Sequence, residues 1–188
     1  MKIFKTVCLA LVAVVFTCSC NSNEKKERQY IDLGLSVNWA DVNEEGTSIE
    51  EIGDYYLYSD LSSMGEKVIP SVKEAEELIQ NTTHEWTTIN GIEGYKFTAF
   101  NGNSIFLPAT GRITFLSDLL RYFTFNLLGS ASDTNEGYYL LRRDDKYEDH
   151  ILWFNKDTIS ILNEDDFSSW NHFAARRVEG GFNRLFGE

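Results

Sequence analysis

Cysteine occurs only at the start of this chain. Cys8, Cys18 and Cys20 lie within the first twenty residues, and no cysteine follows them. A polypeptide without thiols cannot form disulfides, offer a cysteine nucleophile, or hold zinc or an iron–sulfur cluster through sulfur. The part of the chain after Cys20 must therefore be stabilised by a hydrophobic core alone, and it is long enough for one domain of ordinary size.

The segment that holds these cysteines is typical of a secretion signal. Lys2 and Lys5 give it a positive start, and residues 7–17 form an uncharged run. A run of this length suits the apolar part of a signal peptide and is too short to span a bilayer. We therefore expect residues 1–19 to be a signal peptide. The alternative is a buried helix at the start of the domain.

Cys20 ends this segment in a pattern that resembles the lipobox of bacterial lipoproteins, where small residues precede a cysteine that is acylated and becomes the new N-terminus. Ser19 before Cys20 is small, whereas bulky Phe16 lies two residues before Cys18. Thr17 stands where the lipobox usually has leucine. The resemblance implies that Cys20 is the lipid anchor of an outer-membrane lipoprotein in the bacterial cell envelope, either periplasmic or exposed at the surface.

The residues after Cys20 separate the predicted anchor from the predicted domain. Residues 20–29 contain the polar run NSNEKKERQ, which we expect to be a flexible tether. Apolar alternation begins at Tyr30, so we expect one domain over residues 30–188. Acyl chains hold a protein to a membrane by burying methylenes, each worth about 0.8 kcal/mol.

The chain is strongly acidic. Its formal net charge is −12, and without the two lysines of residues 1–19 the remainder carries 15 basic against 29 acidic side chains. Such a surface repels nucleic acid and anionic lipid headgroups. We therefore expect no nucleic-acid partner and a membrane contact made through the acyl group. Solubility is the simplest explanation of the charge.

Local signals predict one helix and two hairpins. Ser71 precedes Glu74 by three residues, which is the capping box of a helix, and the apolar residues of SVKEAEELIQ fall on one face. Asn90-Gly91 and Asn101-Gly102 are strong hairpin signals, because asparagine and glycine tolerate a positive φ. We expect a helix over residues 71–80 and a three-stranded antiparallel meander over residues 84–111.

Further apolar and alternating runs predict short strands, and the run at residues 113–130 is compatible with either a helix or a packed loop. Together these patterns predict an α+β domain of mostly short antiparallel strands with one or two helices. The runs expected to be strands are residues 30–43 (two strands and a turn), 53–60, 137–143, 150–155, 158–163 and 172–179.

Several of these segments resemble the Fibrobacter succinogenes major paralogous domain. The opening YIDLGLSVNWADVN and the later GDYY match that family's Tyr-Val-Asp-Leu-Gly-Leu, Trp-Ala and Gly-Asp-Tyr pattern, and NGNSIFLPA at residues 101–109 matches a more specific motif. The likeness covers residues 30–180. It departs at residues 137–141, where the family usually has Tyr-Trp-Ser-Ser, and at residues 177–179, where Arg-Pro-Val is common.

The resemblance implies a C-type-lectin-like fold, a small twisted sheet with one or two helices and a long-loop region that carries the ligand face. It also implies a place among lipoproteins and surface proteins of gut-type bacteria. On this basis the loops near residues 112–137, 142–150 and 163–172 form the expected binding face.

No pattern of residues predicts catalysis. The chain has no Gly-x-Ser-x-Gly, and its three histidines do not have zinc-site spacing. We therefore expect no enzyme activity and no cofactor.

Asp144, Asp145 and Asp149 are weak calcium candidates, because calcium prefers several carboxylates from one loop, but they lack EF-hand spacing. The alternative is solvated loop charge.

Aromatic side chains give the best candidates for ligand contact. Flat rings stack on sugars and peptides at little entropic cost. Trp170 lies in DFSSWNHF beside a polar turn and is the tryptophan best placed to contact a ligand at the surface. The alternative is that Trp170 packs in the core. Tyr147 in the acidic loop is the second candidate for ligand contact. The tripeptide WNH at residues 170–172 is similar to the Trp-Asn-Asp of C-type lectins, which adds Asn171.

These observations lead to one expected function and one alternative. We expect a lipid-anchored envelope protein that recognises a glycan, a peptide or a surface protein without catalysis. The alternative is a structural or accessory subunit of a surface appendage or outer-membrane complex.

The anchor can be tested directly. Cells that express the chain and are fed a labelled fatty acid should incorporate the label, because acylation requires the thiol of the lipobox cysteine. Cys20→Ser should abolish incorporation, whereas Cys18→Ser should leave it unchanged. Labelling that survives Cys20→Ser and is lost in Cys18→Ser would move the anchor to Cys18.

Overall fold

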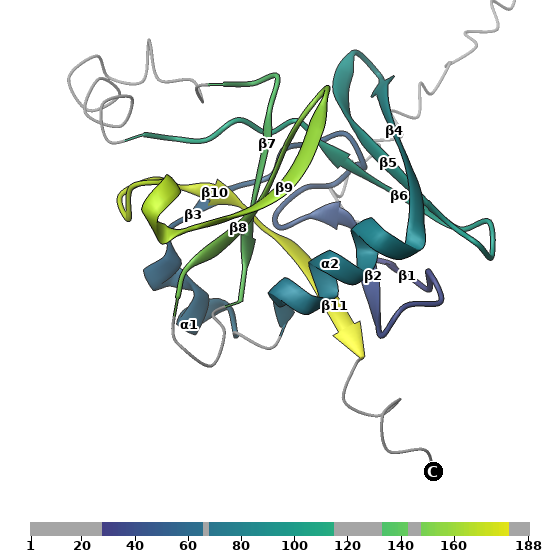
Figure 1. The fold of residues 1–188 in the computed structure, drawn as a ribbon, viewed down its shortest axis with the longest axis horizontal. Coiled ribbons are helices and arrows are strands. Elements are labelled where there is room, and N and C mark those ends of the chain that lie inside the picture. The colour runs from purple at the N-terminus through teal and green to yellow at the C-terminus, as the bar shows by residue number, and fades with distance from the viewer. Residues whose placement is uncertain (1–27, 66–67, 115–132, 143–147, 181–188) are drawn as a thin grey trace, which may run out of the picture.

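Residues 28–65, 68–114, 133–142 and 148–180 are described by a computed structural model of the chain (Figure 1). They form an α+β fold in which short, mostly antiparallel strands make three sheets beside two short α-helices. The predicted fold class is therefore confirmed as α+β.

The three sheets combine strands from distant parts of the sequence. The first has the order β1-β2-β11, the second β3-β10-β7-β8-β9 and the third β4-β5-β6. Among the described strands, β10 and β7 are the parallel neighbours and all other pairs are antiparallel. The bounds are β1 Tyr30–Ile31, β2 Val37–Asn43, β3 Tyr55–Tyr56, β4 Thr82–Ile89, β5 Ile92–Ala99, β6 Ser104–Pro108, β7 Gly137–Leu141, β8 His150–Asn155, β9 Thr158–Asn163, β10 Phe173–Ala174 and β11 Arg176–Gly180.

The predicted helix is α2, Val72–Asn81, and its capping box is confirmed. The Ser71 hydroxyl accepts from the Glu74 N–H at 3.3 Å, and the Glu74 carboxylate accepts from the Ser71 N–H at 2.6 Å. These two bonds satisfy backbone donors that a helix start leaves without an intrahelical partner. Ala75 and Leu78 are buried in the core on the apolar face.

The predicted meander is the third sheet, and both hairpins are confirmed. Asn90 and Gly91 have φ of 49° and 87°, as a two-residue turn with two positive φ angles requires. The β5–β6 connection is longer, and there only Gly102, with φ 86°, has a positive value. Asn101 donates to the carbonyl of Asp32 at 2.8 Å, which ties this loop to the segment after β1.

The prediction of a strand over residues 53–60 is mostly wrong. Only Tyr55 and Tyr56 form a strand, and the chain then enters a 3-10 helix, Tyr58–Asp60, followed by α1, Leu61–Met64. The Asp60 carboxylate accepts from the Leu57 N–H at 2.9 Å and so stabilises the helical turn. This local bond outweighs the β preference of the aromatic residues.

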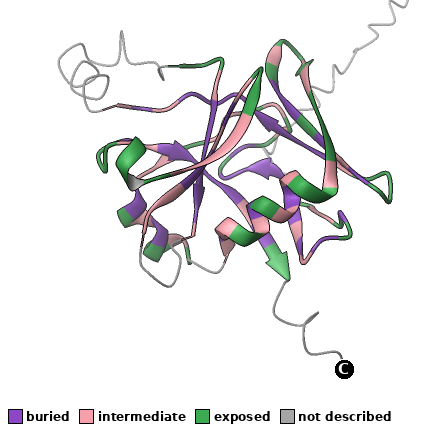
Figure 2. Cartoon of the chain, in the orientation of Figure 1, coloured by how far each residue is buried: buried purple, intermediate pink, exposed green. Residues whose placement is uncertain are grey.

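Strand β7 lies between two hydrophobic clusters. Successive side chains of a strand point to opposite faces, so Tyr139 packs in the larger cluster, around Trp39 and Phe97, whereas Tyr138 packs in the smaller cluster with Phe173. Figure 2 shows the buried residues concentrated on these central strands, with the hairpin tips exposed. Trp39 is 1% exposed, as expected for a core residue.

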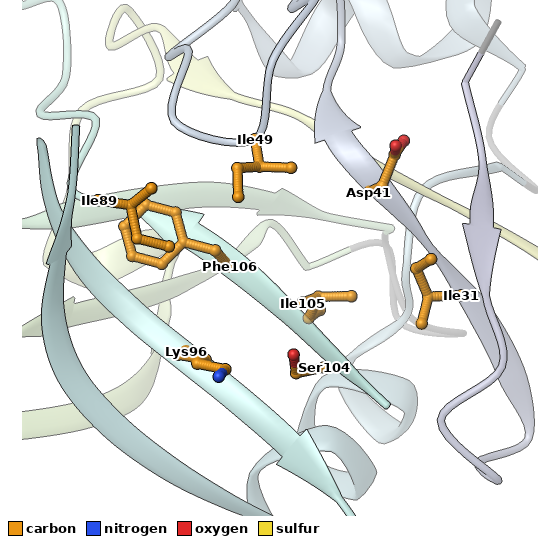
Figure 3. A pocket seen from close by; sticks show the side chains of 8 residues that line it. All are labelled: Ile31, Asp41, Ile49, Ile89, Lys96, Ser104, Ile105 and Phe106. Atoms are coloured by element: carbon orange, nitrogen blue, oxygen red, sulfur yellow. The ribbon is translucent and has the colours of Figure 1, made fainter. Parts of the chain in front are cut away.

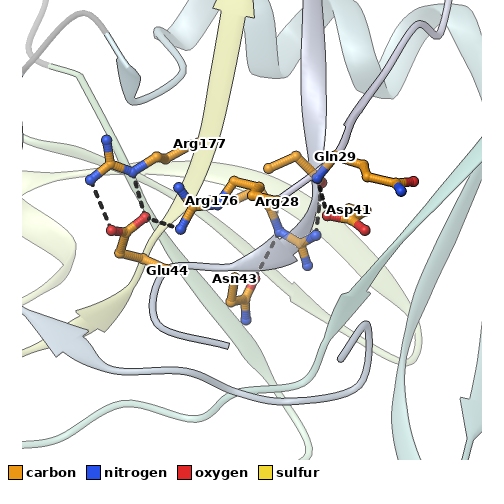
Figure 4. Close-up of polar contacts among 8 residues, drawn as sticks. Arg28, Gln29, Asp41, Asn43, Glu44, Arg176 and Arg177 are labelled. Atoms are coloured by element: carbon orange, nitrogen blue, oxygen red, sulfur yellow. Dashed lines mark hydrogen bonds and ion pairs between the residues drawn. The ribbon is translucent and has the colours of Figure 1, made fainter. Parts of the chain in front are cut away.

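Among the described residues, the most deeply buried charged side chain is that of Arg176 at the start of β11, which is 1% exposed. Its Nε donates to Asn43 Oδ1 at 2.8 Å, its Nη1 to the carbonyl of Ala40 at 2.9 Å, and its Nη2 to the carbonyl of Phe106 at 2.8 Å. The Asn43 amide in turn donates to the Tyr139 hydroxyl at 3.2 Å. The network therefore joins strands of all three sheets. Figure 4 shows the part of it between Arg176 and Asn43.

A second ionic cluster holds the start of the domain. The buried carboxylate of Glu44 accepts from Arg28 at 2.7 Å and from both Nε and Nη2 of Arg177 (Figure 4). Gln29 and Asp41 exchange two further hydrogen bonds, of 2.8 and 3.0 Å. Arg28 and Gln29, assigned to the tether by sequence, thus contact the folded part.

The Arg176 network gives a stability prediction. Arg176→Met should lower the free energy of unfolding by at least about 3 kcal/mol, because it leaves three buried acceptors without their donor. Denaturant titration measures the change. The matched control Lys156→Gln removes an exposed cation and should change stability by no more than about 0.5 kcal/mol. A cost below 1 kcal/mol for Arg176→Met would contradict this account.

Candidate functional site

The hairpin formed by β8 and β9 brings two of the expected loops together. His150 at the start of β8 pairs with Asn163 at the end of β9. The residue before β8 and the residues after β9 therefore leave the sheet at the same end. This register places Asp149 beside the segment 164–170, although they are far apart in sequence.

A pocket of about 470 Å³ lies at this end of the hairpin, and we call it the Trp170 pocket. Asp149 contributes one wall, and the segment after β9 contributes the other. That segment lines it with Asp165, Phe167, Ser168, Ser169 and Trp170.

Two local features shape the wall after β9. The Asn163 side chain accepts from the Asp165 N–H at 3.0 Å, which caps the 3-10 helix Glu164–Asp166. The Phe167 ring then stacks on Tyr58, with centroids 6.0 Å apart, and meets the edge of Phe173 at 5.2 Å. Phe167 thus anchors the segment on the smaller hydrophobic cluster.

Trp170 follows this anchor in a turn. Its N–H donates to the Ser168 hydroxyl at 3.4 Å, and the N–H of Asn171 donates to the Ser168 carbonyl at 2.9 Å. The turn leaves the Trp170 side chain 66% exposed. A large exposed aromatic residue is more informative about binding than an exposed polar one.

The pocket combines three kinds of recognition group. The indole offers a flat face for stacking, the carboxylates of Asp149 and Asp165 accept hydrogen bonds, and two serine hydroxyls both donate and accept. Hydroxyl-rich neutral ligands and cations suit this set, whereas the two carboxylates repel anions.

The other predicted site residues have different outcomes. Asn171 is 7% exposed and is not among the residues that line the pocket. Cys20, Asp144, Asp145 and Tyr147 lie outside the described residues, as does most of the run at residues 113–130. Within the described ranges, no group of three or more histidine, cysteine, aspartate or glutamate residues is arranged to hold a metal ion. The calcium site therefore stays a prediction.

Two of the remaining tryptophans pack at the edges of the core. Trp86 is half-buried and meets Tyr95 edge-on with centroids 5.2 Å apart. Trp153 is half-buried against the smaller cluster, and its Nε1 donates to the Glu136 carboxylate at 2.8 Å. Of the four tryptophans, Trp170 is the exposed one.

The expected loop near residues 163–172 contains Phe167, Ser168 and Ser169, but sequence reasoning did not single them out as site residues. A signal was available, because an apolar residue inside a polar turn after a predicted strand often anchors that turn to the core. Neither serine carries a signal of its own, since hydroxyl residues are common in turns.

Comparisons with protein-family models, with curated proteins and with solved structures found no match. Among the helices of the described part, none has the length and apolar character that a membrane span requires.

The anchoring role of Phe167 can be measured. Phe167→Ala should lower the free energy of unfolding by about 2 kcal/mol, less than for a fully buried phenylalanine, because it removes both ring contacts from a half-buried site. Phe100, which is fully exposed at the β5–β6 turn, supplies the control. Phe100→Ala should change stability by less than about 0.5 kcal/mol. Equal effects in the two variants would show that Phe167 does not anchor the pocket wall.

Proposed function

We propose that this protein is a lipid-anchored binding protein of the bacterial cell envelope, with a C-type-lectin-like fold similar to the Fibrobacter succinogenes major paralogous domain. It recognises its ligand without chemical change. The α+β arrangement of short antiparallel strands with two short helices is compatible with such a fold. The lipobox-like Cys20 supports the place in the envelope.

The exposed indole of Trp170 in its pocket is the observation that carries the proposed function. Exposing a large aromatic side chain to water is unfavourable, and a stacked ligand removes that cost. Carboxylates and hydroxyls around the indole would bind the hydroxyl groups of a sugar. A neutral glycan is therefore the best-supported ligand, ahead of a peptide or a surface protein.

A glycan panel tests the proposal. The full chain is electrophoresed through gels that contain neutral, cationic or anionic polysaccharides. At least one neutral polysaccharide should retard it, because the indole stacks on the sugar ring. Trp170→Ala should abolish the retardation, and Asp165→Asn should weaken it, since a charged acceptor makes the stronger hydrogen bond. Trp170→Phe, which keeps a stacking face, should retain part of it.

Phe100→Ala is the matched control, because it removes an exposed aromatic ring outside the pocket and should leave the retardation unchanged. If none of the neutral polysaccharides retards the chain, a neutral glycan is rejected as the ligand. Recovery of a stable protein partner by crosslinking on cells, unaffected by Trp170→Ala, would instead favour the structural subunit.

A further inference from the structure

A second pocket lies beside the edge strand β6, largely on the face of the β4–β6 sheet that carries Lys96 and Phe106. In that sheet Lys96 pairs with Phe106, and Thr98 pairs with Ser104. Cross-strand partners share a face, so these side chains point away from Tyr95 and Phe97, which belong to the core. The pocket has a volume of about 340 Å³, and none of the described residues that line it also lines the Trp170 pocket.

Most of this pocket is apolar, and we call it the isoleucine pocket. Side chains from β1, from β4, from β6 and from the loop after β2 converge on it (Figure 3). Its volume lies in the range that small ligands occupy in proteins. The apolar lining consists of Ile31, Ile49, Ile89, Ile105 and Phe106.

Lys96 and Ser104 make one side of the pocket polar (Figure 3). Ser104 pairs with Thr98, two residues along β5 from Lys96, so the two are diagonal neighbours across the strands. Lys96 is exposed. Its direct cross-strand partner on β4 is Glu85, but among the described residues its ammonium group is in no hydrogen bond or ion pair. A cation beside an apolar surface, in a chain of net charge −12, is available to an incoming anion.

Asp41 lies on a different wall of the pocket, on β2 (Figure 3). Its Oδ1 already accepts from the Gln29 N–H at 3.0 Å. The carboxylate of Asp41 repels an anion at its own wall, and Lys96 attracts it at the other. This distribution of charge orients a ligand that has one anionic and one apolar end.

We propose that the isoleucine pocket binds an apolar carboxylate. The apolar group, about as large as one aliphatic or aromatic side chain, inserts among the isoleucines. Its carboxylate pairs with the Lys96 ammonium group and accepts a hydrogen bond from Ser104. A free carboxylic acid and the C-terminal residue of a peptide share this chemistry.

Matched acids and amides test the proposal with the full chain. Calorimetric titration compares 4-methylpentanoic acid with 4-methylpentanamide, and an acetylated tripeptide ending in leucine with its C-terminal amide. Each acid should bind roughly tenfold more tightly than its amide, because only the acid forms a charge-assisted pair with Lys96. Lys96→Gln should remove this preference. Ile89→Ala should weaken binding of acid and amide alike by severalfold, since it removes apolar wall.

Lys156→Gln has the same charge change outside both pockets and should keep the full preference for acids. Preference for the free acid alone would identify a small-molecule ligand, and preference for the peptide acid would identify a peptide terminus; both support the site. Equal binding of acid and amide, an unchanged preference in Lys96→Gln, or no binding of any of the four compounds would overturn it. None of these results bears on the glycan assay, because the two pockets have no lining residue in common within the part of the chain that the structure describes.

Discussion

The buried guanidinium of Arg176 is the constraint on which the arrangement of the sheets depends. Removing a charge from water is costly unless every polar contact is replaced, and here the acceptors come from β2 and β6. Burial lowers the pKa of Arg176 to about 10, so that the group is still charged at neutral pH. The carbonyls of Ala40 and Phe106 must therefore remain where its donors can reach them, and the sheets cannot slide independently.

The pairing of β2 with β11 is irregular where Arg176 binds. Arg176 pairs with Asn43, whereas Val178 pairs with Trp39, so that two steps along β11 correspond to four along β2. The extra residues interrupt the alternation of β2, and residues on both of its faces are buried. Such a bulge re-aims backbone groups. Here the re-aimed groups include the Ala40 carbonyl that Arg176 binds.

Each candidate pocket uses part of this frame. The carbonyl of Phe106 accepts from Arg176, and its ring lines the isoleucine pocket. β10 ends two residues before Arg176, and Phe173 within β10 supports Phe167 under the Trp170 pocket. Fixing Arg176 therefore fixes a wall of one pocket and the support of the other.

The sequence predicted those elements whose stabilising contacts are local. The Ser71–Glu74 capping box spans four residues, and the Asn90-Gly91 turn spans two, so their patterns can be read directly. Trp170 could be identified as an exposed candidate because its neighbours are polar. Arg176 could not be recognised as a core residue, since its partner Asn43 lies 133 positions away and nothing in HFAARRVE distinguishes it from Arg177. The isoleucine pocket escaped prediction for the same reason, because its walls meet only after the sheets have formed. The two loops that line the Trp170 pocket were expected to form a binding face, but the pocket between them was not predicted.

Overall charge does not decide what each pocket selects. Interactions between exposed charges are largely screened beyond about 8 Å at physiological ionic strength, so the net charge of −12 acts mainly on approach and solubility. Within each pocket the nearest groups dominate. Asp149 and Asp165 make the Trp170 pocket repel anions, whereas Lys96 makes one side of the isoleucine pocket attract them. One acidic chain can therefore present two sites with opposite charge preferences, and the placement of a few side chains by strand register determines which preference each site has.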